Sequence, residues 1–121
     1  MGVIKSYRDL EVWQKAMRLA EICYKATEEF PKREIFGLAS QLRRAVVSIP
    51  SNIAEGNSRN SRPAYLNHLS IALGSQSEVE TQVELASRLN MIPPDHTHEI
   101  LALAGQVGRM LHARIASLER K

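Results

Sequence analysis

The residues with the clearest chemical potential are arginines in the second quarter of the chain. Residues 31–62 hold six basic and two acidic residues, a net charge of +4, whereas the whole chain of 121 residues carries +3. Clustered guanidinium groups attract phosphate or carboxylate-rich surfaces. The alternative is a solvated helix face with ordinary, weak ion pairs. The candidate contacts for nucleic acid are Arg43, Arg44, Arg59 and Arg62.

The residue patterns of common enzymes and metalloproteins do not occur. No glutamate has a histidine three residues later, as the di-iron sites of helical bundles require. His96 and His98 are two residues apart, so a helix would point them to different sides. There is no glycine-rich phosphate loop and no nucleophile elbow. The single cysteine, Cys23, lies in an apolar stripe. We therefore expect no enzymatic activity, no metal and no cofactor.

Helices must position these arginines. Alanine and leucine, both strong helix formers, supply 13 residues each, and no alternating strand pattern occurs. Apolar periodicity predicts four helices, over residues 9–30, 33–57, 62–91 and 95–121. Ser6 followed by Asp9 is typical of a capping box, and Ser61 before Pro63 indicates a third helix start. Four helices with short connections predict an all-α, antiparallel up-down four-helix bundle in a single domain, 1–121.

Proline interrupts the apolar pattern of the second helix. Pro50 removes a backbone hydrogen bond and crowds the preceding turn. We therefore expect a kink near Pro50, or a break after which Asn52 caps a last short turn with Glu55 three residues on. Gly56 and the residue after it suit a helix end.

The helices carry more apolar and small residues than one bundle needs. The first helix has two adjacent stripes, too broad for a helix covered by one neighbour. Gly74 in the third helix predicts close approach by another helix. The stripes are Trp13, Met17, Ala20, Tyr24 and Thr27; Val12, Ala16, Leu19, Cys23, Ala26 and Phe30; and, on the second helix, Ile35, Leu38, Leu42, Val46, Ile49 and Ile53. Self-association would bury the surplus. No membrane-length apolar run or signal core occurs, so we expect a cytoplasmic protein that does not enter a membrane.

Residues 36–59, FGLASQLRRAVVSIPSNIAEGNSR, resemble the 23S rRNA intervening-sequence protein family. DLEVWQKA at residues 9–16 and IALGSQSEVETQVELA at residues 71–86 extend the likeness in the same order. The resemblance implies a four-helix bundle that assembles as a homopentamer. It also implies a bacterial gene inside a 23S rRNA insertion or elsewhere on the chromosome. The accessory variability protein of diversity-generating retroelements, which binds nucleic acid and a reverse transcriptase, is similar in fold.

Within the motif, Gln41, Arg43 and Arg44 match the family's Q-x-R-R segment. Successive helical residues point about 100° apart, so one of the two arginines should pair with a carboxylate and the other should meet solvent or a partner. Asn52 and Glu55 should satisfy backbone groups at Pro50 rather than perform chemistry.

Arg59 and Arg62 are the preferred phosphate contacts, because they lie in a polar loop after Gly56. Trp13 and Tyr24 belong to the core stripe, so binding should be directed at the nucleic-acid backbone. Two hypotheses follow: an oligomer that binds RNA or DNA, or a protein-protein adaptor, such as an accessory to a nucleic-acid-processing enzyme.

Overall fold

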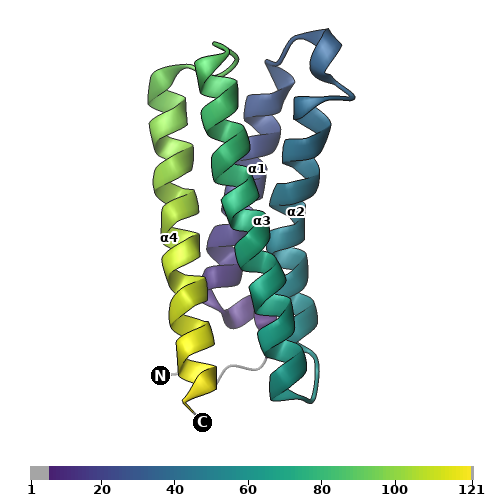
Figure 1. Ribbon diagram of the computed structural model, residues 1–121, viewed down its shortest axis with the longest axis vertical. Helices are drawn as coiled ribbons and strands as arrows, with labels where there is room; N and C mark the ends of the chain where they lie inside the picture. Colours follow the sequence, from purple (N-terminus) through teal and green to yellow (C-terminus); the bar gives the residue numbers. More distant parts are fainter. Residues whose placement is uncertain (1–5, 121) are drawn as a thin grey trace.

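The computed structural model describes residues 6–120 and shows four long helices (Figure 1). No strand occurs among these residues, so the expected all-α four-helix bundle is confirmed. The elements in chain order are η1 (Tyr7–Asp9), α1 (Glu11–Glu28), η2 (Lys32–Glu34), α2 (Leu38–Asn57), α3 (Arg62–Arg88) and α4 (Pro94–Glu119).

Successive helices run in opposite directions (Figure 1). Each helix packs on the next, and α4 returns to pack on α1, which closes the bundle. The α1–α2 and α3–α4 connections lie at the upper end, whereas the α2–α3 connection and the end of α4 lie at the lower end (Figure 1). The two ends of the bundle are therefore built by different connections.

Local capping fixes where the helices begin and end. Ser6 and Asp9 form the expected capping box, although it caps the short η1 rather than α1. Ser61 accepts a hydrogen bond from the backbone of Ala64 and caps α3, with a proline in the first turn. Asn90 adopts a φ of 61° just after α3, a left-handed conformation that asparagine tolerates and that prevents the helix from continuing.

The core is formed by one stripe from each helix. The stripe of α1 that contains Leu19 and Cys23 is buried, as its spacing predicts. Fully buried side chains include Leu19 and Cys23 of α1; Leu42, Val46, Ile49 and Ile53 of α2; Leu69, Val79 and Val83 of α3; and Ile100, Val107 and Leu111 of α4.

Three residues that periodicity placed in the core are exposed. Met17 and Tyr24 are each 40% exposed, because the neighbouring stripe of α1 takes the core position. Ile35 is 54% exposed, because α2 begins only at Leu38. The backbone N–H of Leu38 donates to the carboxylate of Glu34 at 3.0 Å, so Ile35 belongs to the connection and not to the helix.

The second helix continues through Pro50 from Leu38 to Asn57. The alternative of a break capped by Asn52 is therefore wrong. Asn52 instead donates through Nδ2 to the carbonyl oxygen of Ser48 at 2.9 Å, four residues earlier in the same helix. The kink at Pro50 stays a prediction.

Small residues on α3 and α4 behave differently from one another. A Cβ on Gly74 would meet no atom within 4 Å, so no other helix of the same copy approaches closely at Gly74. Close packing occurs at Gly108, where a Cβ would lie 2.9 Å from the amide nitrogen of Gln76. That nitrogen donates to the carbonyl oxygen of Ala104 at 2.9 Å, which joins α3 to α4 inside the bundle. Within residues 6–120, no helix combines the length and apolarity that crossing a bilayer requires.

Candidate nucleic-acid interface

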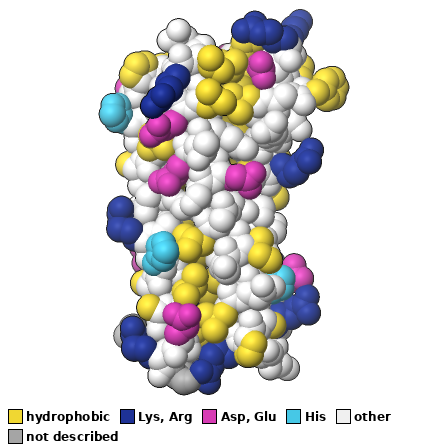
Figure 2. Space-filling model, in the orientation of Figure 1, with side chains coloured by type: hydrophobic (Ala, Val, Ile, Leu, Met, Phe, Trp, Pro, Cys, Tyr) yellow, Lys and Arg dark blue, Asp and Glu magenta, His cyan; other side chains and the backbone are white. Residues whose placement is uncertain are grey.

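Two of the four candidate arginines lie together at the lower end of the bundle. Arg59 lies in the connection between α2 and α3, and Arg62 is the first residue of α3. Both are exposed, as are the two residues between them. Several Lys and Arg side chains lie at this end of the visible face, and others lie at the upper end (Figure 2). The structure therefore presents Arg59 and Arg62 on a polar, accessible segment.

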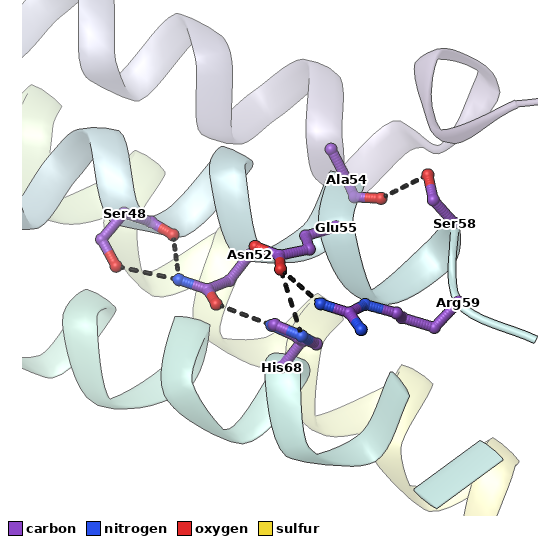
Figure 3. Close-up of polar contacts among 7 residues, drawn as sticks. All are labelled: Ser48, Asn52, Ala54, Glu55, Ser58, Arg59 and His68. Atoms are coloured by element: carbon purple, nitrogen blue, oxygen red, sulfur yellow. Dashed lines mark hydrogen bonds and ion pairs between the residues drawn. The ribbon is translucent and has the colours of Figure 1, made fainter. Parts of the chain in front are cut away.

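Arg59 pairs with Glu55, one helical turn earlier (Figure 3). Its Nη2 atom lies 2.7 Å from Oε2 of Glu55, and the two side chains are 54% and 53% exposed. The hydrogen bond from Arg59, with the nearby His68, holds the pKa of the Glu55 carboxyl below its usual range. Glu55 is therefore ionised at neutral pH. An exposed pair of this kind contributes little to stability, so a phosphate group can replace the carboxylate at low cost.

A polar network joins α2 to α3 beside this pair (Figure 3). Nδ1 of His68 lies 3.0 Å from Oδ1 of Asn52, and Nε2 of His68 lies 3.8 Å from Glu55. The Nδ2 group of Asn52 also donates to Oγ of Ser48 at 3.1 Å, and that oxygen accepts a 2.9 Å hydrogen bond from Ser75. The network joins α2 to α3 on the side of α2 where Glu55 pairs with Arg59.

Gly56 lets the two helices approach at this network. A Cβ on Gly56 would lie 2.7 Å from Cβ of His68 and 3.0 Å from the ring of Tyr65. The Tyr65 hydroxyl oxygen accepts a hydrogen bond from Asn57 at 3.3 Å. Gly56 is therefore a packing residue inside α2 rather than a helix terminator. Sequence spacing gave no sign of His68 as a partner, because it lies 16 residues from Asn52.

Arg43 faces α1. Its Nε donates to Oγ1 of Thr27 at 2.7 Å, and its guanidinium carbon lies 4.9 Å from the centre of the Tyr24 ring. The Thr27 hydroxyl in turn donates to the carbonyl oxygen of Tyr24. Arg43 is half-buried in these contacts and joins α2 to α1.

Arg44 faces the opposite seam, between α2 and α3. It is exposed and lines a shallow groove that also contains Gln41, Ser48, Ser75 and Glu78. The expectation that one of the two adjacent arginines pairs with a carboxylate is wrong for residues 6–120, where neither forms an ion pair.

The four candidate arginines do not form one patch on a single copy. Arg44 and Arg59 are 15 residues apart, which is roughly 22 Å along a helix axis. Arg43 lies on a different side of the bundle from Arg44. Among the described residues, no cluster of three or more His, Cys, Asp or Glu side chains could hold a metal ion. The strongest candidate contact is therefore the pair Arg59 and Arg62.

Comparison with known proteins places these features in context. A family model described as 23S rRNA-intervening sequence protein matches residues 8–113. A crystal structure from Bacteroides thetaiotaomicron VPI-5482, described as a protein with unknown function from the S23 ribosomal protein family, is similar in fold, with a TM-score of 0.78 and 27% identity. The match covers 86% of this chain and 97% of that one. No curated protein matches the sequence.

Proposed function

This chain belongs to the 23S rRNA-intervening sequence protein family, and from that premise we propose that it is a non-enzymatic, oligomeric protein that binds the phosphate backbone of RNA or DNA. The observation that carries the proposal is the exposed segment from Arg59 to Arg62, which joins α2 to α3 in the sequence region with the highest positive charge. Arg43 and Arg44 have other surroundings and are secondary candidates.

The contact is directed at the backbone rather than at bases. Five of the six aromatic side chains are engaged in contacts within the fold. Their contacts are these: Tyr7 packs edge-on against Trp13, Tyr24 lies under Arg43, Tyr65 meets Asn57, and Phe30 is buried. The sixth, Phe36, is exposed but lies in the α1–α2 connection, at the opposite end of the bundle from Arg59. Arginine contacts to phosphate then give binding that tolerates sequence and weakens with salt.

Assembly strengthens the argument from charge. One copy carries a modest formal charge of +3, so a homopentamer carries +15. A ring repeats the Arg59 and Arg62 segment at a fixed spacing, and several weak contacts on one assembly add up to useful affinity. The exposed apolar side chains, among them Ile35, Phe36 and Leu85, support self-association.

The direct test is fluorescence anisotropy with labelled RNA and duplex DNA at several salt concentrations. We expect micromolar binding at low salt that falls steeply as salt rises. The double variant Arg59→Glu, Arg62→Glu should weaken binding at least about tenfold with unchanged helicity. The double variant Arg18→Glu, Arg109→Glu, which makes the same four-unit change of charge on the exposed faces of α1 and α4, is the matched control and should retain most of the binding. Absence of any binding at low salt with excess protein would refute the proposal.

The second candidate is a protein-protein adaptor that does not touch nucleic acid. Arg44 favours it, because this exposed side chain has no carboxylate partner among residues 6–120 and sits at the rim of a groove. An acidic partner surface would supply the missing charge. Recovery of one specific protein after nuclease treatment, lost in Arg44→Glu and kept in Arg59→Glu, would favour the adaptor over the nucleic-acid proposal.

A further inference from the structure

The most exposed large apolar side chain lies at the upper end of the bundle. Phe36 is 96% exposed, and the preceding Ile35 is 54% exposed. Both lie in the connection between α1 and α2, at the end opposite to Arg59 (Figure 1). A phenylalanine with almost its whole surface in water is costly unless a partner covers it. The segment Lys32–Phe36, hereafter the 32–36 loop, is therefore a candidate docking element.

The 32–36 loop is held in a defined shape. Oε1 of Glu34 accepts the hydrogen bond from the backbone of Leu38 at the start of α2. The same oxygen would lie 2.7 Å from a Cβ on Gly37, so only glycine leaves room for this carboxylate. The Glu34 carboxylate is half-buried against the first turn of α2, so Lys32 and Arg33 are the exposed charged residues of the loop. The loop thus presents an aromatic ring beside two cations.

A complementary surface lies at the same end of the molecule. A groove of about 590 Å³ runs between α3 and α4, lined by Leu85 and Leu101 together with Glu80, Glu84 and Arg88. Arg88 lies 3.9 Å from Glu84 in an exposed ion pair, a weak contact that an incoming cation can replace. Leu85 is 46% exposed. Hydrophobic side chains gather over the upper part of α3 on the visible face (Figure 2). The groove therefore offers apolar contact for a ring and acidic side chains for Lys32 and Arg33.

We propose that the 32–36 loop of one copy docks into the α3–α4 groove of the next copy, with Phe36 packed on Leu85 and Leu101. Lys32 and Arg33 face Glu80 and Glu84 across this contact. This inference rests on the oligomer of the proposed function and identifies the two surfaces through which its copies contact each other.

The position of the two surfaces favours a closed ring. They are different parts of the chain, so the contact is head to tail, and such contacts close only when the rotation between copies brings the last copy back to the first. The loop and the groove both lie near the upper end, where α1 and α3 finish and α2 and α4 begin (Figure 1). Copies can therefore pack side by side with parallel bundle axes and without a translation along the ring axis from one copy to the next.

Light scattering on the purified chain tests the contact. Wild type should show a mass several times that of one copy, and Phe36→Asp should shift it to the monomer. Phe36→Ala should weaken the junction by about 30-fold or more, as expected for a central aromatic contact. Ile71→Ala, which shortens another exposed apolar side chain on α3 outside both surfaces, is the matched control and should leave the mass unchanged.

Mixing two defective variants gives the sharper test. Phe36→Asp lacks a working loop, and Leu85→Asp lacks a working groove, so each should be monomeric with wild-type helicity. An equimolar mixture retains one intact loop and one intact groove, and it should form a one-to-one dimer that grows no further. Charge reversal adds a second measurement: Arg33→Glu should weaken assembly, and Glu84→Arg in the same chain should restore it.

The outcomes separate this inference from the proposed function. If Phe36→Asp keeps the wild-type mass, or if the mixture stays monomeric, the docking contact is wrong although an oligomer can still exist. If wild type itself is monomeric at all concentrations, both the contact and the assembly are wrong. Nucleic-acid binding is measured separately through Arg59 and Arg62, so its result does not decide the docking contact.

Discussion

Nδ1 of His68 on α3 lies 3.0 Å from Oδ1 of Asn52 on α2, two residues beyond Pro50. One turn later, Gly56 removes the side chain that would otherwise separate the helices at this point. The amide of Asn52 thus bonds within its own helix and across to the next. This pair ties the proline-containing half of α2 to α3 and sets the direction of the segment that carries Arg59.

Gly56→Ala should destabilise the fold by about 1–3 kcal/mol, because the new methyl group collides with His68 and Tyr65. Gly74→Ala is the matched control on α3. Its methyl group meets open space, so the higher helix propensity of alanine should stabilise the protein by about 0.5–1 kcal/mol. Urea unfolding followed by circular dichroism measures both, and equal effects at the two glycines would contradict the packing described at Gly56.

Asn52 and His68 should be energetically coupled. Each single change to alanine removes the same hydrogen bond, so a double-mutant cycle should give a coupling of about 1 kcal/mol in unfolding free energy. His112→Ala, on the exposed face of α4, should change stability by less than about 0.5 kcal/mol. Additive effects of Asn52→Ala and His68→Ala would show that the contact does not form in solution.

Glu55→Gln should strengthen binding to RNA or DNA by roughly threefold to tenfold. The carboxylate competes with phosphate for Arg59, and its removal leaves the guanidinium group available. The comparison is anisotropy at fixed salt, with Glu119→Gln on α4 as a control for the change in net charge. Weaker binding in Glu55→Gln would mean that the ion pair positions Arg59 for its contact instead of competing with it.

The same carboxyl predicts a small pH effect on stability. Its pKa in the folded chain is lower than the usual value of 4.5, mainly because Arg59 hydrogen-bonds to the ionised form. The stabilisation is therefore fully present above pH 4.5 and is lost as the pH falls through the lowered value. Wild type and Glu55→Gln should differ in urea midpoint at pH 7 and converge as the pH falls through the lowered pKa of Glu55. A difference that grows towards acid would contradict this sign.

Cys23 should be unreactive in the folded protein. Burial raises its pKa to about 12, so the thiol stays protonated and is screened from reagents. Labelling with a disulfide reagent at pH 8 should be at least about 100-fold slower than in urea, since it requires unfolding. The chain has one cysteine, so the signal is unambiguous. Rapid labelling of the native protein would place Cys23 outside the core.

Periodicity in the sequence predicted the bundle because each helix has a stripe that only burial can satisfy. Leu19 and Cys23 illustrate this success. It failed for Met17 and Tyr24, since two adjacent stripes on α1 satisfy the same spacing and only the rotation of the helix decides between them. That rotation depends on contacts from other helices, such as Arg43 over Tyr24, which no local pattern encodes.

The candidate site was predicted in part. The exposed loop with Arg59 and Arg62 follows from its turn-forming residues. The partner of Glu55 across the seam, His68, is distant in sequence and becomes a neighbour only through the α2–α3 connection. Arg43 likewise donates to the hydroxyl of Thr27 and not to a carboxylate, because the packing of α1 on α2 places Thr27 opposite Arg43.

Helix α2 has 20 residues, about 30 Å in length, with the 32–36 loop before it and the Arg59 segment after it. In a ring of parallel copies, the aromatic rings would all lie on one rim and the Arg59 segments on the other. The two rims of such a ring therefore differ in chemistry. The ring would meet a nucleic acid from a single direction, while its opposite rim holds the copies together.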